Sequence, residues 1–427
     1  MSRLDGYMAK QFHIAPEQLS RSVIEAKQLG AVNQLLQWCK SHSGYYDDYP
    51  EQLQSLDEIT MLPFLTAQTL AEHCQELVCV SQSEISRVVT MQTSGTSGLQ
   101  KRLYFSEADQ QLTVDFFACG LSELNEPGDR CMILMPGHRP GGMSYLIGQA
   151  LEQIGAIPVP CGYDKTFAEM AELLQQQQVT TMVGSPVQIL SLARYLRHYQ
   201  LPHRIKAVLV SSDYLPETVR HAIEETLHCD VYDHYGITEA GLGFSIECEC
   251  HQGLHMREND LLVEIIEPQT LQPVPDGQWG EMVFTTLTRR AMPLIRYRTG
   301  DKARLLAEPC ACGSIVKRMD KIPGRIQQLE DCYCMPVLDE LLFQLPQVMD
   351  YQARYSSVKK QLHLHLLLTE NVMHLEQKVD TLLRSVLQKG DTLQLTMDVL
   401  CEINRYAVKS LYAAKRKLIQ EDGHETE

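Results

Sequence analysis

The sequence predicts an α/β protein. A large N-terminal domain has helix-flanked, mainly parallel sheets and a β-rich subdomain, and a small mobile α+β C-terminal domain follows. Strand-like and helix-like runs alternate between residues 131 and 232, the pattern of a parallel sheet covered by helices. Two strand-like runs flank a Pro/Gly turn between residues 261 and 288, which favours antiparallel pairing. After residue 350, strand-like runs surround one helical pattern, as expected for a separate α+β unit.

In chain order, residues 1–84 are expected to form a helical lead-in to the large domain, and a strand follows at 85–92. A second strand, at 103–105, leads to Ser106 and Asp109, whose spacing is that of a capping box at a helix start. The strands predicted next are 131–136, 156–160, 180–184, 205–211 and 230–232, and the helices between them are 143–154, 167–178, 187–199 and 216–228.

The remaining predicted elements lie beyond residue 260. Ligands of parallel sheets collect at the carboxyl ends of the strands, which is where the motifs below fall. The predicted core spans 85–326 and includes the β subdomain at 245–315, and the C-terminal domain spans 327–427. In the β subdomain we expect strands at 261–267 and 281–288. In the C-terminal domain we expect strands at 351–356, 362–368 and 393–400 and a helix at 375–389.

Composition narrows the classes of function. The 427 residues are 44% apolar and 22% charged, as in an ordinary globular protein. Acidic residues outnumber basic ones by 54 to 38, for a net charge of −16, which argues against binding nucleic acid through its phosphates. There is neither a bilayer-spanning apolar run nor a signal-peptide start, so we expect a cytoplasmic protein without a membrane partner. The 14 cysteines favour thiols or a metal site over disulfides.

A run of hydroxyl residues and glycines closed by Lys101 follows the strand at 85–92. Glycines let the backbone approach an anion, N–H and hydroxyl groups surround phosphate oxygens, and the lysine adds a positive charge. Gly98 lies three residues from both Gly95 and Lys101, so the run is not a Walker A motif. By composition alone, a flexible surface turn is the alternative. The phosphate-binding candidates are Thr93, Ser94, Gly95, Thr96, Ser97, Gly98 and Lys101.

This run and the later motifs resemble the acyl-adenylate-forming (AMP-binding) superfamily, over residues 60 to 345. The resemblance implies that 93–101 holds the β- and γ-phosphates of ATP. In Tyr235-Gly236-Ile237-Thr238-Glu239 it implies that Tyr235 packs on adenine, Thr238 meets the α-phosphate and Glu239 helps to hold Mg²⁺. These residue types suit the chemistry, because a purine gains from an aromatic face and Mg²⁺ prefers oxygen ligands.

Three more nucleotide-binding candidates follow from the same resemblance. Asp301, in Tyr-Arg-Thr-Gly-Asp, would accept hydrogen bonds from both ribose hydroxyls, for which the two carboxylate oxygens are suited. Arg325 would contact ribose or phosphate, and Asp213 would lie beside adenine. The alternative reading of the Gly-Asp pair is an ordinary turn.

A narrower resemblance, to the phenylacetate–CoA ligase branch, rests on cysteines and a histidine. Some members of this branch carry zinc here, and the corresponding residues are Cys248, His255, Cys310 and Cys312. A closed Cys₃His set is tetrahedral and therefore structural rather than catalytic. Cys250 could replace Cys248, and buried thiols without a metal are the remaining alternative.

The chain departs from the family after Gly324-Arg325, where the aspartate pair of the family hinge is missing. The C-terminal lysine of the family follows a glycine, whereas here Ala-Ala precedes Lys415. Lys415 is the candidate catalytic lysine, Lys417 is the second choice, and a solvated basic helix end is the alternative. These departures leave the hinge rotation, and with it thioester formation, open.

The resemblance implies an ATP-dependent acid–thiol ligase in which a carboxylate forms acyl-AMP and CoA then forms the thioester. The implied partners are ATP, Mg²⁺, CoA, a structural Zn²⁺ and a small carboxylic acid of aryl or arylacetic type. A homodimer is one option for its assembly. The alternatives are an adenylating enzyme that passes the acyl group to a carrier protein or another acceptor, and a non-catalytic nucleotide- or zinc-binding relative.

Overall fold

A computed structural model of the chain describes residues 2–92, 100–326, 329, 333–356, 358–387, 393–401 and 419–420. The chain forms two compact units. The first comprises residues 1–123, 139–150 and 234–326, and the second comprises 124–138, 151–233 and 327–427. Each unit draws on segments far apart in sequence, and the predicted division at residues 84 and 326 stays a prediction.

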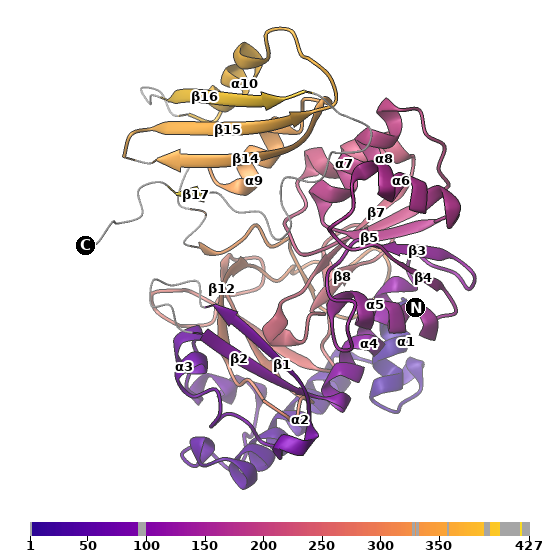
Figure 1. Cartoon of the computed structure of the whole chain (residues 1–427). Coiled ribbons are helices and arrows are strands. Elements are labelled where there is room, and N and C mark those ends of the chain that lie inside the picture. Colours follow the sequence, from indigo (N-terminus) through magenta and orange to yellow (C-terminus); the bar gives the residue numbers. More distant parts are fainter. Residues whose placement is uncertain are drawn as a thin grey trace. The chain divides into compact units, whose positions relative to one another are not determined.

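The first unit opens with the predicted helical lead-in. Its helices are α1 (Arg3–Gln11), α2 (Arg21–His42) and α3 (Ala67–Glu72). The predicted strand β1 (Ile85–Gln92) pairs antiparallel with β2 (Gln100–Ser106), as Figure 1 shows. The predicted capping box begins α4 (Glu107–Leu121): Ser106 Oγ accepts the Asp109 N–H at 3.1 Å, and Asp109 Oδ2 accepts the Ser106 N–H at 2.9 Å.

Antiparallel strands form another part of the first unit. The predicted β-rich subdomain contains β10 (Leu261–Ile266), β11 (Gly280–Thr286) and β12 (Tyr297–Ala303) in one sheet. Alternate residues of β12 are buried, as expected for a strand with one face on a core. Three short strands extend in turn from the end of strand β7 (Asp230–Tyr235), in the order β8 (Ser245–Glu247), β9 (Leu254–Met256) and β13 (Arg318–Met319).

The second unit contains the predicted parallel sheet, with its strands in the order β7, β6, β5, β3 and β4. Strand β5 is buried throughout, as is typical of a parallel strand covered on both faces. The elements agree with the predicted ranges to within a few residues. The strands are β3 (Arg130–Ile133), β4 (Ile157–Pro160), β5 (Thr181–Gly184), β6 (Ala207–Val210) and β7 (Asp230–Tyr235), and the helices are α5 (Met143–Gln153), α6 (Phe167–Gln176), α7 (Pro186–His198) and α8 (Glu217–Leu227). Of these, α5 as far as Ala150 and the end of β7 from His234 belong to the first unit.

The C-terminal segment of the second unit has the predicted α+β character (Figure 1). Helix α9 was not predicted; it begins after Cys334 and carries a proline in its first turn. The predicted helix at 375–389 ends at Arg384. The elements are α9 (Met335–Leu342), β14 (Val348–Ser356), β15 (Gln361–Leu368), α10 (Leu375–Arg384), β16 (Gln394–Leu400) and β17 (Ile419–Gln420), with the strands in the order β16, β15, β14, β17.

This C-terminal segment packs on α7 and α8 within one hydrophobic core. Arg194 of α7 is buried and donates to the carbonyl oxygens of Val348 and, at 2.8 Å, Phe343. At the start of α8, the carboxylate of Glu340 accepts the N–H groups of Glu217 (2.7 Å) and Thr218 (3.0 Å). A carboxylate at a helix N-terminus satisfies N–H groups that the helix itself leaves unpaired. The predicted mobility of this segment stays a prediction.

Among the residues described, no helix is long and apolar enough to cross a bilayer.

Candidate functional site

The predicted phosphate loop connects two paired strands. In the β1–β2 hairpin, Gln92 lies opposite Gln100 and Met91 lies opposite Lys101, so the ladder determines where the loop begins and ends. Lys101 is therefore a residue of strand β2. The other candidates of this loop lie outside the described residues: Thr93, Ser94, Gly95, Thr96, Ser97 and Gly98.

Lys101 and Glu239 form a buried ion pair. Lys101 Nζ donates to Glu239 Oε1, and the Tyr297 hydroxyl donates to the same oxygen at 3.1 Å. Lys101 is 3% exposed and Glu239 is 4% exposed. Burial alone would raise the pKa of the Glu239 carboxyl, but the adjacent Lys101 ammonium outweighs burial and holds this pKa below its usual range. The predicted phosphate-binding lysine and the predicted magnesium ligand are therefore in direct contact, and Glu239 is anionic.

The carboxylate of Asp301 brings two other predicted residues together. Tyr235, at the end of β7, donates its hydroxyl to Asp301 Oδ2 at 2.5 Å, and Arg325 Nε lies 3.8 Å from Oδ1. Asp301 and Arg325 also pair through a backbone bridge. Burial and then the Asp301 charge raise the pKa of Tyr235 well above its ordinary value, so its hydroxyl stays protonated and donates. Two residues expected to contact the nucleotide thus lie against the carboxylate of a third, Asp301.

The turn after Tyr235 requires glycine because the backbone folds back on itself. A Cβ at Gly236 would lie 1.6 Å from the carbonyl oxygen of Leu242, and no side chain fits that distance. The Leu242 N–H donates to Ile237 O at 2.8 Å and closes the turn. Within it, the 3₁₀ turn η5 (Thr238–Ala240) begins with half-buried Thr238 and continues with Glu239. This close approach determines the direction in which Thr238 and Glu239 leave β7.

The remaining predicted residues of this site are Asp213 and the two C-terminal lysine candidates. Asp213 belongs to the second unit, where its carboxylate accepts the Tyr214 N–H at 3.0 Å. Lys415 and the alternative Lys417 lie outside the described residues. The roles of these residues stay predictions.

A second cluster in the first unit brings together the predicted Cys₃His set, Cys248, His255, Cys310 and Cys312. Their four potential ligand atoms lie within 4.8 Å of one another. Cys248 Sγ is 3.6 Å from Cys310 Sγ, and Cys312 Sγ is 3.5 Å from His255 Nε2. A tetrahedral zinc with Zn–S bonds of about 2.3 Å places its sulfur ligands about 3.8 Å apart, close to the first distance.

The surroundings of His255 favour metal binding. Its Nδ1 lies 3.2 Å from the carbonyl oxygen of Val316, which selects the tautomer that leaves the Nε2 lone pair facing Cys312. Burial lowers the pKa of His255 to about 4, so the imidazole is neutral at neutral pH, as a metal ligand must be. Of the two alternatives for the first ligand, Cys248 is in the cluster and Cys250 is outside it.

Sequence reasoning gave no role to two buried residues at the motif positions, Tyr297 and His234. Tyr297 stood in a recognised motif, but its contact with Glu239 joins positions 58 apart. His234, directly before Tyr235, is buried near the rings of Phe116 and Phe117, and burial followed by the charge of Arg257 lowers its pKa to about 4. Its place in front of the Tyr-Gly motif was the available signal.

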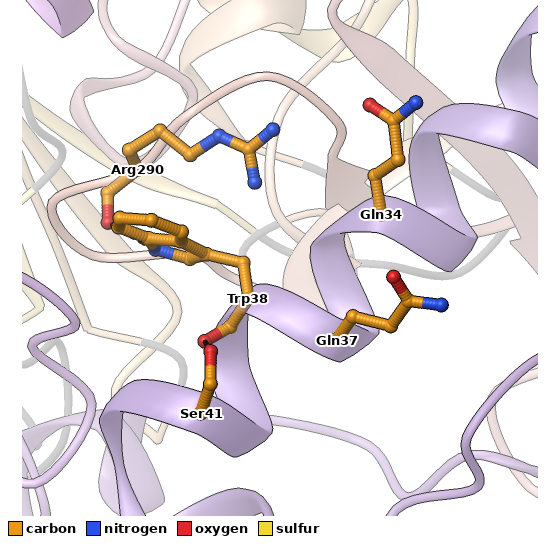
Figure 2. Close-up of a pocket in the computed structure, with 5 residues that line it drawn as sticks. All are labelled: Gln34, Gln37, Trp38, Ser41 and Arg290. Atoms are coloured by element: carbon orange, nitrogen blue, oxygen red, sulfur yellow. Dashed lines mark hydrogen bonds between the residues drawn. The ribbon is translucent and has the colours of Figure 1, made fainter.

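An open pocket of about 430 Å³ lies on another part of the first unit. Figure 2 shows the lining residues Gln34, Gln37, Trp38 and Ser41 on α2, with Arg290 over the Trp38 ring. The Arg290 guanidinium lies 5.2 Å from the centre of the Trp38 ring, and Trp38 Nε1 donates to Arg290 O at 3.2 Å. The lining contains none of the predicted site residues, and its contacts hold the loop around Arg290 against α2.

Comparison with known proteins places this geometry in a family. The model of the family described as AMP-binding enzyme matches residues 47–287, more than half of the chain. The chain belongs to the AMP-binding enzyme family. The match includes the phosphate-loop hairpin and the Tyr-Gly-Ile-Thr-Glu turn and ends before Asp301.

Curated relatives of this AMP-binding enzyme include phenylacetate-coenzyme A ligases. That of Thermus thermophilus is 29% identical over 289 residues, covering 66% of this chain and 64% of the ligase. That of Aromatoleum evansii is 30% identical over 285 residues, covering 65% and 63%. The matched region therefore spans less than two thirds of these relatives. It confirms the predicted resemblance to the phenylacetate–CoA ligase branch.

Solved structures confirm the predicted fold class of this AMP-binding enzyme. A 2-hydroxyisobutyryl-CoA ligase in the postadenylation state, in complex with 2-HIB-AMP, superposes with a TM-score of 0.79. The alignment covers 95% of this chain and 91% of that ligase at 21% sequence identity. A benzoate CoA ligase from Burkholderia xenovorans reaches a TM-score of 0.52 at 14% identity, with the alignment covering 74% of this chain and 65% of that ligase, and it shares the same general fold.

Proposed function

We propose that this AMP-binding enzyme is an ATP-dependent carboxylate–CoA ligase that works through an acyl-adenylate. A carboxylate oxygen attacks the α-phosphorus of ATP, the bond to the bridging oxygen breaks, and pyrophosphate leaves. The CoA thiolate then attacks the acyl carbon, and AMP leaves. The observation that carries the proposal is the buried contact of Lys101 with Glu239, in a chain of this family.

Different residues of the first unit bind different parts of the nucleotide. Lys101 and the loop 93–98 bind the β- and γ-phosphates, Thr238 meets the α-phosphate, and Tyr235 packs on adenine beside Gly236. Asp301 accepts from the ribose hydroxyls, with Arg325 next to it. Positioning and charge stabilisation account for most of the rate in such a reaction, because the protein forms no covalent bond. Asp213 beside adenine and Lys415 at the reacting groups complete the assignment.

Glu239 is the proposed ligand of Mg²⁺. The donor fits, because it is an oxygen and the Lys101 ammonium keeps it anionic despite burial. Bound Mg²⁺ would neutralise charge on the phosphate oxygens of the nucleotide. The chain's own contribution is to hold this carboxylate, kept anionic, next to Lys101.

The Cys₃His cluster is the proposed structural zinc site. Three thiolates and a neutral imidazole are a closed ligand set, with no open position for a water or substrate. The short S–S and S–N distances and the orientation of His255 by Val316 support this assignment.

ATP–pyrophosphate exchange over a panel of carboxylic acids, each with and without CoA, tests the proposal. We expect exchange with one aryl or arylacetic acid and a CoA-dependent thioester of the same acid. If the protein binds ATP yet exchanges with no acid and forms no thioester, the ligase proposal is wrong.

A second candidate function is adenylation with an acceptor other than CoA, such as a carrier protein. The sequence after Gly324-Arg325 favours it, since the aspartate pair of the family hinge is missing. Exchange with an acid, without any CoA-dependent product, would select this candidate.

A further inference from the structure

Three consecutive backbone carbonyls around Glu239 each accept a hydrogen bond from a buried side chain. Arg289 Nη1 donates to Glu239 O at 2.7 Å, Arg257 Nη2 donates to Ala240 O at 2.9 Å, and Thr113 Oγ1 donates to Gly241 O at 2.6 Å. All three donors are buried. They come from α4, the segment after β9 and the segment after β11, so distant parts of the chain converge on the turn η5.

Arg289 links this turn to the strand that carries Lys101. Its guanidinium lies 4.7 Å from the centre of the Phe105 ring, and Phe105 is a residue of β2. One arginine therefore contacts the backbone of Glu239 and the strand of its ion-pair partner. The planar guanidinium donates in fixed directions, so it restricts the orientation of the carbonyl as well as satisfying it.

The backbone beside Arg289 is itself anchored on both sides. The Asp109 carboxylate, which caps α4, accepts the N–H groups of Arg290 (3.0 Å) and Ala291 (3.2 Å). On the other side, Trp38 Nε1 donates to Arg290 O, and the Arg290 guanidinium covers the Trp38 ring (Figure 2). These contacts hold the chain so that Arg289 points to the turn while Arg290 points to the surface pocket.

The space around Gly241, at the end of the turn, leaves little room for a side chain. Gly241 has φ = 80°, and a Cβ there would lie 3.1 Å from Arg289 Nη2 and 3.2 Å from Thr113 Oγ1. Arg257 is held in turn by Asp260, whose Oδ2 lies 3.4 Å from Arg257 Nε. The turn is thus closely surrounded by its donors.

From these contacts we infer that Arg289, Arg257 and Thr113 are positioning residues that aim the Glu239 carboxylate at the divalent cation of the nucleotide. Buried carbonyls need partners in any fold, and neutral donors would satisfy them. Here Arg289 also places a positive charge near a carboxylate that must stay anionic. The inference rests on the proposed role of Glu239 as the Mg²⁺ ligand.

The test compares ATP binding with and without Mg²⁺, measured by calorimetry on the full chain. The first variants are Thr113→Val, which keeps the shape and removes the donor, and Thr113→Ser, which retains a hydroxyl. We expect Thr113→Val to lower the Mg²⁺-dependent gain in ATP affinity by about tenfold, with Mg²⁺-free affinity unchanged and Thr113→Ser close to wild type. Thr286→Val is the matched control, because Thr286 is buried in the same unit and bonds Leu294 instead.

The second pair is Arg289→Met and Arg289→Lys. We expect Arg289→Met to lower the Mg²⁺-dependent gain by about 10- to 100-fold and Arg289→Lys to recover part of it. If Arg289→Met does not fold, the Thr113 pair decides. A lowered melting temperature with an unchanged Mg²⁺-dependent gain would show a purely structural role and overturn the inference, as would a wild type whose ATP affinity ignores Mg²⁺. A wild type that binds Mg·ATP but exchanges no pyrophosphate would instead refute the proposed function and leave this test in force.

Discussion

The cluster around Glu239 and the cluster around His255 lie in the same unit, but the polar groups in them are stabilised in different ways. Lys101, Glu239 and Tyr297 bond one another, so opposite charges compensate within the chain. In the Cys₃His cluster the contacts are S–S and S–N, which are weak hydrogen bonds. A bound cation would supply the compensating positive charge that the second cluster lacks. We therefore expect the first cluster to govern turnover and the second to govern stability through its metal.

The largest expected effect tests the compensation in the first cluster. Glu239→Gln should lower pyrophosphate exchange by about 10²–10³-fold. It should also destabilise the protein by roughly 3–5 kcal/mol, because Lys101 is left buried without its counter-charge. The double variant Lys101→Met/Glu239→Gln should regain much of the stability and none of the activity. Exchange assays and urea unfolding measure the two effects.

A matched control for this ion pair is Asp380→Asn, which breaks the exposed pair of Asp380 with Arg384. A surface pair of this kind contributes about 0–1 kcal/mol, so stability and exchange should both stay near wild type. If the double variant is as unstable as Glu239→Gln, the charges of Lys101 and Glu239 do not compensate each other.

The next effect concerns the second cluster. Cys312→Ser should reduce bound zinc from about one per chain and lower the melting temperature by roughly 5–10 °C, because metal binding is coupled to folding. The half-saturating ATP concentration should not change. Cys250→Ser, just outside the cluster, serves as the control. Wild-type protein stripped of metal, confirmed metal-free by elemental analysis, and melting at an unchanged temperature would contradict the zinc assignment.

A smaller effect is expected for His234 below neutral pH. Its pKa is about 4 in the folded protein, lowered from 6.5 by burial and then by Arg257. The unfolded chain therefore binds a proton between pH 6.5 and 4 that the folded chain does not, and stability falls as pH falls through this window, by up to about 1.4 kcal/mol per unit. His234→Gln should show a shallower fall in its urea midpoint, and parallel curves would contradict the assignment.

The smallest expected effect is that of Tyr235→Phe. The variant keeps the ring and removes the hydroxyl that donates to Asp301. One hydrogen bond contributes about 1 kcal/mol net, so the half-saturating ATP concentration should change by about fivefold or less. Tyr235→Ala, which also removes the ring, should have a clearly larger effect. Equal effects of the two variants would argue against a role for the ring.

The sequence was informative where local pattern and spacing carry the signal. The alternating apolar runs predicted the parallel sheet, and Ser106 with Asp109 predicted the start of α4. The Cys-x-Cys spacing identified half of the Cys₃His cluster. Helix α9 escaped prediction because eight residues span barely two turns, and the proline of its first turn was the only strong start signal.

The long-range contacts that orient the side chains of the site could not be predicted from one sequence. Lys101 and Glu239 are 138 positions apart, and Thr113 and Gly241 are 128 apart. No local periodicity relates such positions, since they meet only through the packing of whole elements. Arg289 stands next to Arg290 in the sequence, and its burial beneath the turn is a property of the tertiary fold.

The docking of the C-terminal segment on α7 and α8 has a practical consequence for dividing this protein into pieces. A chain cut at residue 326 would leave Arg194 buried without the carbonyls of Phe343 and Val348 and would strip Glu340 from the start of α8. It would also expose apolar side chains of α7 to water, which promotes aggregation. The fragment that ends where the family hinge begins is therefore a poor choice for separate expression, and a soluble half has to retain α9 and β14.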